Sequence, residues 1–352
     1  MAKELIKVEL KNGLVFNGRK IYVQSMLSKP LNNIKSNIEQ ALELEAAGCE
    51  ILRVALLSTA DIELIKHLKQ HISIPLVADV HFDHRIALAA VEAGVDKIRI
   101  NPGNLGDELK IKQVVAACNQ ANVPIRIGVN GGSLEKQVSG QNFNCEADAM
   151  VASALRNIEL LEKFNFRKIV VSMKSSNVVQ TIKAYRILRK KCSYPFHVGV
   201  TEAGVLKSSL IKFSIGIGSL LFDGIGETIR VTITGDPVEE VKAGHEILRA
   251  LGLEKTGVEV VACPTCGRTK INIEEIANLV ESKTKFIKTP IKVAIMGCVV
   301  NGPGEARGAD LAIAGGDGCA MLFKKGKACG KINESEIGKV LLDEIFNLSG
   351  GF

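Results

Sequence analysis

Three cysteines and one glutamate in the last third of the chain have the residue types and spacing of a metal centre. Cys263 and Cys266 are separated by two residues in CPTCGRT, directly after a predicted strand, and Cys298 follows a second predicted strand in MGCVVNGPGEARG. The C-x2-C pair alone fits a redox dithiol, half of a zinc site or a chance spacing equally well. Three thiolates without a fourth cysteine or histidine nearby close a structural zinc site poorly, whereas soft thiolates suit iron–sulfur clusters.

Glu305 is the candidate for a fourth ligand. It stands seven residues after Cys298, behind a Gly302-Pro303-Gly304 turn that can bend sharply and bring backbone amides near the sulfurs. A carboxylate would bind iron weakly and leave that iron open to a substrate oxygen, but the spacing fits a solvated loop carboxylate equally well. The other cysteines are isolated, and we expect them to be small buried hydrophobic side chains: Cys49, Cys118, Cys145, Cys192, Cys319 and Cys329.

A second group of candidates stands at the ends of predicted strands in the first two-thirds of the chain. Five of them are cations, each from a different strand: Arg53, Arg99, Arg126, Lys174 and Arg230. A single charged residue at a strand end is more often a solvated loop residue. Five cations in one concavity repel one another, however, and arginine forks bind phosphate oxygens bidentately. Together they favour a phosphate or diphosphate pocket.

Less strongly charged residues accompany these cations. Asn130, Thr201 and Thr232 are polar candidates at the same strand ends. His81 is either a ligand-binding donor or a hydrogen-bonded histidine at the mouth of the pocket. Glu202 is an acid among cations, and it could either neutralise an arginine or protonate a leaving oxygen.

A closed parallel barrel would bring all these side chains together. Eight short β-branched segments, each followed by a stretch with helical periodicity, are expected to be strands: 20–25, 50–55, 76–81, 97–101, 125–129, 168–173, 197–201 and 228–233. In a TIM (β/α)8 barrel the carboxyl ends of all strands open into one mouth. A doubly wound open sheet is the alternative, because the sequence counts strands without showing closure.

Two local patterns refine this α/β interpretation. The helical segment after the first strand places Ile34, Ile38 and Leu42 on one apolar face. An Asn12-Gly13 pair between 8–10 and 14–16 predicts a leading hairpin that plugs one end of the barrel.

The pattern changes after a polar linker at 254–257, which separates a barrel domain at 1–253 from a small α/β domain at 258–352. The second domain is expected to contain strands at 258–262, 292–296, 311–314 and 321–324, a helix at 273–283, and a helix at 335–348 capped by Asn333. Both cysteine segments fall in this domain.

Composition limits the class of protein. Of 352 residues, 46% are hydrophobic and 24% charged, which is typical of a packed globular protein. No apolar run could span a membrane and the charged opening segment lacks a secretory signal, so we expect a cytoplasmic protein with reduced thiols. The net charge of +7 suits an anionic small molecule or an acidic partner. The absence of Trp and the 4% aromatic content disfavour nucleic-acid binding.

Six segments of the chain together resemble the 4-hydroxy-3-methylbut-2-enyl diphosphate synthase family: CPTCGRT, MGCVVNGPGEA, KIRINPGN, IRIGVNGGS, VTEAG and ETIRVTIT. The resemblance covers essentially the whole chain and implies a TIM barrel followed by a small iron–sulfur domain. The implied cofactor is one [4Fe-4S] cluster held by Cys263, Cys266, Cys298 and Glu305. The implied substrate is 2-C-methyl-D-erythritol 2,4-cyclodiphosphate, bound by the five cations together with Asn130 and Thr232.

The resemblance also implies a reaction and partners. The ring opens and a hydroxyl leaves as water while two electrons enter through the cluster, with Glu202 as the candidate proton donor. The electrons come from flavodoxin or ferredoxin, which are acidic carriers compatible with the net charge. A head-to-tail homodimer, with one subunit's cluster domain capping the partner's barrel, would unite the two halves of the site. The length is that of the compact two-domain bacterial type.

From the residues alone, two other functions stay open. One is a barrel enzyme acting on a phosphorylated metabolite with a structural zinc, for which Cys319 is the closest spare thiol. The other is a non-catalytic electron-transfer protein. An open fourth ligand position argues against the latter, because a carrier gains nothing from an exposed iron.

Overall fold

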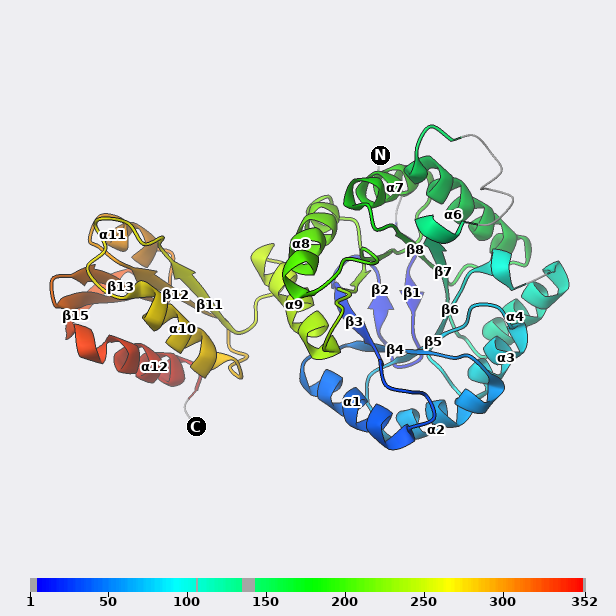
Figure 1. The fold of residues 1–352 in the computed structure, drawn as a ribbon, viewed down its shortest axis with the longest axis horizontal. Helices are drawn as coiled ribbons and strands as arrows, with labels where there is room; N and C mark the ends of the chain where they lie inside the picture. Colours follow the sequence, from blue (N-terminus) through cyan, green and yellow to red (C-terminus); the bar gives the residue numbers. More distant parts are fainter. Residues whose placement is uncertain (1–4, 106, 135–142, 351–352) are drawn as a thin grey trace. The chain divides into compact units, whose positions relative to one another are not determined.

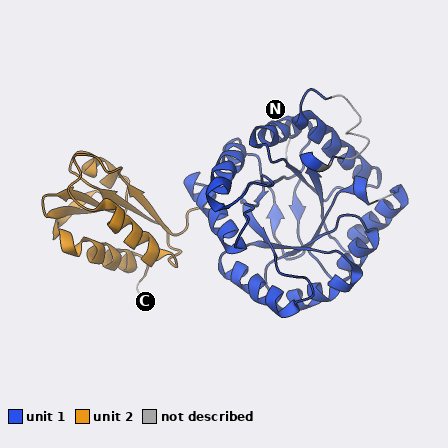
Figure 2. Cartoon of the chain, in the orientation of Figure 1, with its two compact units in different colours: residues 1–253 blue, residues 254–352 orange. Residues whose placement is uncertain are grey.

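The computed structural model describes residues 5–105, 107–134 and 143–350. The chain divides into two compact units, residues 1–253 and 254–352 (Figures 1 and 2). The division falls at the start of the predicted linker. Within the described residues, no helix is long and apolar enough to cross a membrane.

Unit 1 is a barrel of parallel strands surrounded by helices (Figure 1). Around the described barrel the strand order is β8-β7-β6-β5-β4-β3-β10-β9. The strands are β3 Tyr22–Met26, β4 Ile51–Ala55, β5 Leu76–Asp79, β6 Lys97–Ile100, β7 Ile125–Asn130, β8 Ile169–Lys174, β9 His197–Val198 and β10 Thr228–Ile229. A parallel bridge between Val171 and Phe196 joins β8 to the start of β9, where Val171 N donates to Pro195 O at 2.9 Å. The predicted TIM barrel is therefore confirmed, and the alternative of a doubly wound open sheet is wrong.

The barrel strands are rich in Val and Ile because both of their faces are covered. β5, β6 and β8 are buried along their whole length, as expected for parallel strands between a packed interior and outer helices. The outer segments are α1 Ile34–Ala46, η1 Thr59–Asp61, α2 Ile62–His71, α3 His84–Glu92, η2 Pro102–Asn104, α4 Glu108–Gln120, η3 Gly131–Ser133, α6 Glu146–Lys163, α7 Val178–Lys191, α8 Leu206–Phe222 and α9 Pro237–Ala250.

The last two barrel strands are shorter than predicted. β9 ends at Val198 and β10 at Ile229, although both segments were expected to continue for several residues. Gly199 passes so close to the neighbouring chain that a Cβ on it would lie 2.6 Å from the carbonyl oxygen of Arg230. Arg230 N donates to Val198 O at 3.0 Å just before this crossing, and the next hydrogen bond between the two segments among the described residues, from Thr234 N to Gly204 O at 3.1 Å, comes several residues later.

The sequence placed Leu42 on the apolar face of α1, and this prediction is wrong. That side chain is 44% exposed, and the buried residues of the helix are Asn37, Gln40, Ala41 and Leu44. Two polar side chains can be buried here because the preceding loop satisfies them. Asn37 Nδ2 donates to Pro30 O at 2.8 Å, and Gln40 Oε1 accepts from Ser28 N at 2.9 Å.

The predicted hairpin closes the amino end of the barrel. Strands β1 Val8–Glu9 and β2 Val15–Phe16 pair antiparallel, and Gly13 in the turn has a φ of +84° that suits glycine. The hairpin packs through Val8, Leu10 and Phe16 on the barrel residues Ile51, Val77 and Val170. Both strands lie inside the ring of Figure 1, so the plug is confirmed.

Unit 2 is a smaller α/β unit built on a mixed sheet with the order β11-β12-β13-β14-β15 in the described residues. Its elements are β11 Val258–Ala262, α10 Ile273–Thr284, β12 Ile291–Met296, α11 Gly302–Ala306, β13 Leu311–Gly316, β14 Cys319–Lys324, β15 Lys327–Asn333, η4 Glu334–Glu336 and α12 Ile337–Leu348. β11, β12 and β13 are parallel, whereas β14 and β15 are antiparallel to their neighbours. α10 and α12 pack on one face of the sheet and α11 on the other.

Several expectations in unit 2 need correction. The sequence did not predict α11 or β15, which is short of apolar residues because it is an exposed edge strand. Asn333 does not cap the last helix: the 3-10 turn η4 precedes α12, and Asn333 Nδ2 donates to Glu336 Oε2 at 3.3 Å.

The isolated cysteines, in both units, are only partly buried as predicted. Cys329 lies exposed on β15, and Cys145 and Cys319 are half-buried. Only the remaining isolated cysteines are buried as predicted: Cys49, Cys118 and Cys192.

Candidate functional site

A cavity of about 140 Å³ lies at the carboxyl ends of the barrel strands. Every residue that the sequence placed in the substrate pocket lines it: Arg53, His81, Arg99, Arg126, Asn130, Lys174, Thr201, Arg230 and Thr232. Two further residues, Asp79 and Ser172, complete the lining. Barrel closure brings these side chains together from strands that are far apart in sequence.

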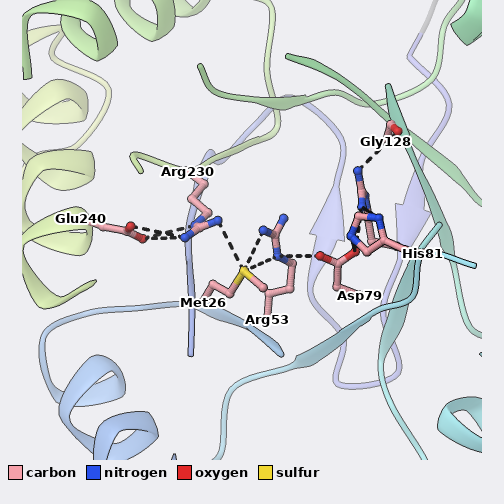
Figure 3. Close-up of polar contacts among 8 residues, drawn as sticks. Met26, Arg53, Asp79, His81, Gly128, Arg230 and Glu240 are labelled. Carbon is pink, nitrogen blue, oxygen red and sulfur yellow. Dashed lines mark hydrogen bonds and ion pairs between the residues drawn. The ribbon is translucent and has the colours of Figure 1, made fainter. Parts of the chain in front are cut away.

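Asp79, the last residue of β5, holds two of the arginines (Figure 3). Its Oδ1 accepts from Arg99 Nη1 at 3.0 Å, and its Oδ2 lies 3.6 Å from Arg53 Nε. Arg99 Nη1 also lies 2.8 Å from His81 Nε2. Burial raises the pKa of Asp79, but the Arg53 charge, the His81 hydrogen bond and Arg99 together hold that pKa well below its usual range. Asp79 is therefore an anion that fixes two cations.

Glu240 holds Arg230 from the outer helix α9 (Figure 3). Its Oε2 accepts from Arg230 Nε and Nη2, both at 3.2 Å, and its Oε1 lies 3.3 Å from Nη2. Ser25 Oγ and Ile233 N each donate to the same carboxylate at 3.1 Å. With Glu240 only 4% exposed, this network sets the direction in which Arg230 enters the cavity.

Met26 stands between two of the arginines at the end of β3. Its Sδ accepts from Arg53 Nε at 3.0 Å and Nη2 at 2.8 Å, and Arg230 Nη1 approaches it at 3.6 Å (Figure 3). A thioether is a weak, uncharged acceptor. It therefore spaces the two guanidinium groups without neutralising them.

Arg126 and Lys174 are buried cations with few partners. Arg126 is the second residue of β7, so it enters the cavity from within the barrel rather than from a strand end, and it is 1% exposed. Its Nε and Nη1 find no hydrogen-bond partner among the described residues. Burial first, and then the neighbouring arginines, lower the pKa of both Arg126 and Lys174. A buried donor without a partner is destabilising, so an oxyanion is the natural complement.

Glu202 is not part of the cavity lining. It is exposed, and it directly follows Thr201, which does line the cavity. Its backbone is left-handed, with a φ of +53°, a conformation that strains a residue with a Cβ.

Three residues of the site escaped the sequence argument: Met26, Ser172 and Glu240. Asp79 carried a signal, since it stands two residues before His81 at the end of the strand predicted for 76–81. Glu240 carried none, because a glutamate in the first turn of a helix is already explained by the helix dipole. Met26 and Ser172 look like ordinary strand residues.

The cysteine segments lie in unit 2 at adjacent strand ends. Cys263 follows β11 and Cys298 follows β12, its parallel neighbour. Gly297 N donates to Cys263 Sγ at 3.2 Å. Backbone hydrogen bonding, chiefly from Arg268, lowers the pKa of Cys266. Because N–H donors stabilise a thiolate, which is the form that binds iron, these residues fit an iron–sulfur group.

Glu305 lies in α11, close in sequence to Cys298. It is exposed, and its carboxylate contacts no hydrogen-bond or ion-pair partner in the described part of the chain. No three His, Cys, Asp or Glu side chains of the described residues converge as they would around a single metal ion. The ligands of an iron–sulfur cluster, in contrast, bind separate irons.

Two family models match nearly the whole chain. The GcpE TIM-barrel domain matches residues 6–245, and the GcpE protein C-terminal domain matches residues 259–347. The chain belongs to the GcpE family.

Curated GcpE relatives extend over the same length. A protein of Caldanaerobacter subterraneus subsp. tengcongensis is 52% identical over 98% of this chain and 97% of its own. One of Clostridium perfringens is 50% identical over 97% of both chains. Both are named 4-hydroxy-3-methylbut-2-en-1-yl diphosphate synthase (flavodoxin). The family expected from the six sequence segments is confirmed.

Solved structures match the barrel. Dihydropteroate synthase from Stenotrophomonas maltophilia superposes with a TM-score of 0.52 at 14% identity, over 70% of this chain and 98% of that chain. The Yersinia pestis dihydropteroate synthase gives a TM-score of 0.51 at 12% identity over 70% and 98%. At such low identity the likeness concerns the fold alone.

Proposed function

We propose that this GcpE protein catalyses the reductive ring opening and dehydroxylation of 2-C-methyl-D-erythritol 2,4-cyclodiphosphate. The product is (E)-4-hydroxy-3-methylbut-2-enyl diphosphate, an intermediate of non-mevalonate isoprenoid biosynthesis. The names of the two relatives contain the 4-hydroxy-3-methylbut-2-en-1-yl diphosphate of this product. The observation that carries this proposal is the cavity lined by five cations and one carboxylate, Asp79, with a second buried carboxylate, Glu240, bound to Arg230 from helix α9. That positive excess requires a polyanion for balance.

The cavity residues have two roles in binding: the cations bind the diphosphate, and the neutral polar residues orient the ring. The diphosphate lies among Arg53, Arg99, Arg126, Lys174 and Arg230, and Arg126 contributes its free N–H donors. His81, Asn130, Thr201 and Thr232 donate hydrogen bonds that orient the ring. Because two carboxylates already fix three of the arginines, little further ordering accompanies binding.

The cofactor of this proposal is one [4Fe-4S] cluster held by Cys263, Cys266, Cys298 and Glu305. When bound, it supplies two electrons, one at a time, and a Lewis-acidic iron. The amide donors to Cys263 and Cys266 support this ligand set. The harder carboxylate of Glu305 makes a weaker fourth ligand than a thiolate.

Glu202 is the proposed proton donor. It protonates the departing hydroxyl, which leaves as water. Its position directly after Thr201 supports this role, and so does its left-handed backbone, because strain of this kind concentrates at functional sites.

We place the two halves of the reaction in a head-to-tail homodimer, with one subunit's cluster domain capping its partner's barrel. An apolar stripe on α8 supports dimerisation: Ile211, Ile215 and Phe222 are 59%, 53% and 84% exposed. Their spacing of four and seven residues puts them on one helix face, and exposed stripes of this kind mark protein interfaces. Flavodoxin, named with the relatives, delivers the electrons.

The metal content of anaerobically purified protein tests the cofactor. We expect about four iron and four sulfide per chain, with a brown chromophore. Cys298→Ser should lose both and leave the barrel folded, whereas the matched variant Cys329→Ser, at an exposed edge strand, should keep them. Zinc without sulfide would overturn the reductive function and leave a phosphate-binding barrel.

Turnover tests the proton donor. Glu202→Gln should bind the cyclodiphosphate and keep its iron while losing product formation with reduced flavodoxin. Glu239→Gln changes a half-buried glutamate of α9 that pairs with Lys242; it is the control and should retain turnover. Unchanged turnover in Glu202→Gln would remove the residue from the mechanism.

A further inference from the structure

The turn between β14 and β15 forms an exposed basic corner of unit 2, made of Arg307, Lys325 and Lys327. Lys325 and Gly326, with φ of +48° and +77°, make a tight two-residue turn, and all three cationic side chains are exposed. None of the three has a carboxylate partner among the described residues. Resting on the function proposed above, we propose that this basic corner is the docking site for an acidic face of flavodoxin.

The corner is in direct contact with the helix that carries Glu305. Gly326 lies beside the end of α11, where a Cβ on it would be in van der Waals contact with Arg307 Cα at 3.4 Å and Ala306 O at 3.7 Å. Lys325 N donates to Asp310 O at 2.9 Å, which ties the turn to the segment after α11. Arg307 stands two residues after Glu305. A protein seated on the corner therefore lies against the end of α11, the helix that carries the proposed ligand Glu305.

The corner lies at the opposite end of the sheet from the cysteines. Lys324, which opens the turn, pairs with Leu311 at the start of β13, whereas Cys263 and Cys298 follow the carboxyl ends of β11 and β12. Flavodoxin seated at the corner would leave the cysteine end free to face substrate. This separation suits a reaction in which flavodoxin is oxidised by one electron at each of two encounters while the substrate stays bound.

The corner is a local concentration of charge in a nearly neutral unit. Residues 254–352 contain 13 basic and 12 acidic side chains. Some other lysines of the unit do have a carboxylate partner: Lys324 Nζ lies 2.7 Å from Glu344 Oε1, and Lys270 Nζ lies 3.0 Å from Asp317 Oδ1. Asp310 is the acid next to the corner, and its Oδ2 accepts a hydrogen bond from Lys292 N at 2.9 Å. A local unpaired positive charge steers an acidic partner to one place.

The test compares two double charge reversals with the same change in net charge. Lys325→Glu with Lys327→Glu alters the corner. Lys283→Glu with Lys339→Glu alters exposed lysines on α10 and α12, which pack on the other face of the sheet. For each anaerobically purified holoenzyme, calorimetry at low salt gives the Kd of a purified bacterial flavodoxin. Turnover is measured with reduced flavodoxin and, separately, with dithionite, a small reductant that needs no docking site.

We expect the corner variant to raise the Kd and the KM for flavodoxin roughly tenfold and to weaken their salt dependence, because steering by exposed charge is screened by salt. Its turnover with dithionite and its iron content should equal those of the parent. The α10/α12 variant should change the Kd less than twofold. An unchanged Kd in the corner variant, or equal losses in both variants, would overturn the docking site. Absence of dithionite-driven turnover in the parent would overturn the proposed function instead, since the Kd is measured independently of turnover.

Discussion

The five cations of the cavity differ, residue by residue, in what restrains them. Asp79 holds Arg53 and Arg99, and Glu240 holds Arg230, whereas Arg126 keeps two buried donors that no described residue satisfies. Restrained arginines lose little conformational entropy when they bind a phosphate, and the unsatisfied N–H donors gain a hydrogen-bond acceptor. The free site is thus both preorganised and short of negative charge.

Replacing Glu240 tests this preorganisation. Glu240→Gln keeps the shape but leaves Arg230 without its buried counter-charge, so we expect a loss of about 3 kcal/mol in the free energy of unfolding. The Kd for the cyclodiphosphate should rise about tenfold. Thermal unfolding and calorimetric titration measure both effects. Glu239→Gln changes a half-buried neighbour on α9 that pairs with Lys242 instead of a cavity arginine; it is the matched control, and equal behaviour of the two variants would contradict the argument.

Lys174 makes anion binding depend on pH. Burial and the adjacent arginines lower its pKa in the free protein, and a bound polyanion favours the charged ammonium and raises that pKa again. Binding therefore takes up protons at pH values between the two, and affinity falls as pH rises through this window. Calorimetry in two buffers of different ionisation enthalpy counts the protons. Lys174→Met should abolish this uptake, and the same proton count in that variant would assign it to another group.

At the scale of elements, neighbouring strands shape each other's side chains. Arg99 of β6 crosses the backbone of β7 at Gly128, and its Nη2 donates to Gly128 O at 3.5 Å. A Cβ at Gly128 would collide with the Arg99 guanidinium. A glycine in the middle of a strand weakens the strand, but here it leaves room for a functional cation.

Gly128→Ala should therefore displace Arg99 and raise the Kd for the cyclodiphosphate at least tenfold, with the barrel still folded by circular dichroism. Gly132→Ala, where an added Cβ meets no atom of the described residues within 4 Å, should leave the Kd unchanged. Normal affinity in Gly128→Ala would show that Arg99 binds elsewhere than in its present position.

For the whole molecule, the apolar stripe on α8 is the feature that predicts assembly. Ile215→Lys places a charge in the middle of the stripe, so sedimentation should show a shift from dimer to monomer and turnover should fall, because each barrel would lose its partner's cluster. Leu109→Lys changes a lone exposed leucine of α4, which is 71% exposed, and should remain dimeric and active. A stable dimer of Ile215→Lys would place the interface on another surface.

Local signals in the sequence determined much of this protein. Short β-branched segments alternating with helical periodicity predict eight strand–helix units, because each pattern reflects burial over a few neighbouring residues. The Asn12-Gly13 turn predicted the hairpin, since glycine adopts the left-handed backbone that the turn needs. The spacing of Cys263, Cys266 and Cys298, and the cations of the barrel strands, likewise identified both sets of candidate site residues.

The tertiary structure alone decided what those residues contact. Barrel closure brought Arg53 to Asp79, and the return of α9 brought Glu240 to Arg230; neither contact leaves a mark on local periodicity. The same applies to Asn37 and Gln40, which are buried on α1 because a loop satisfies them, and to the basic corner, which exists because the turn between β14 and β15 lies against the end of α11. A local pattern reports whether a residue is buried or exposed, whereas the partners of a buried charge are set by long-range packing.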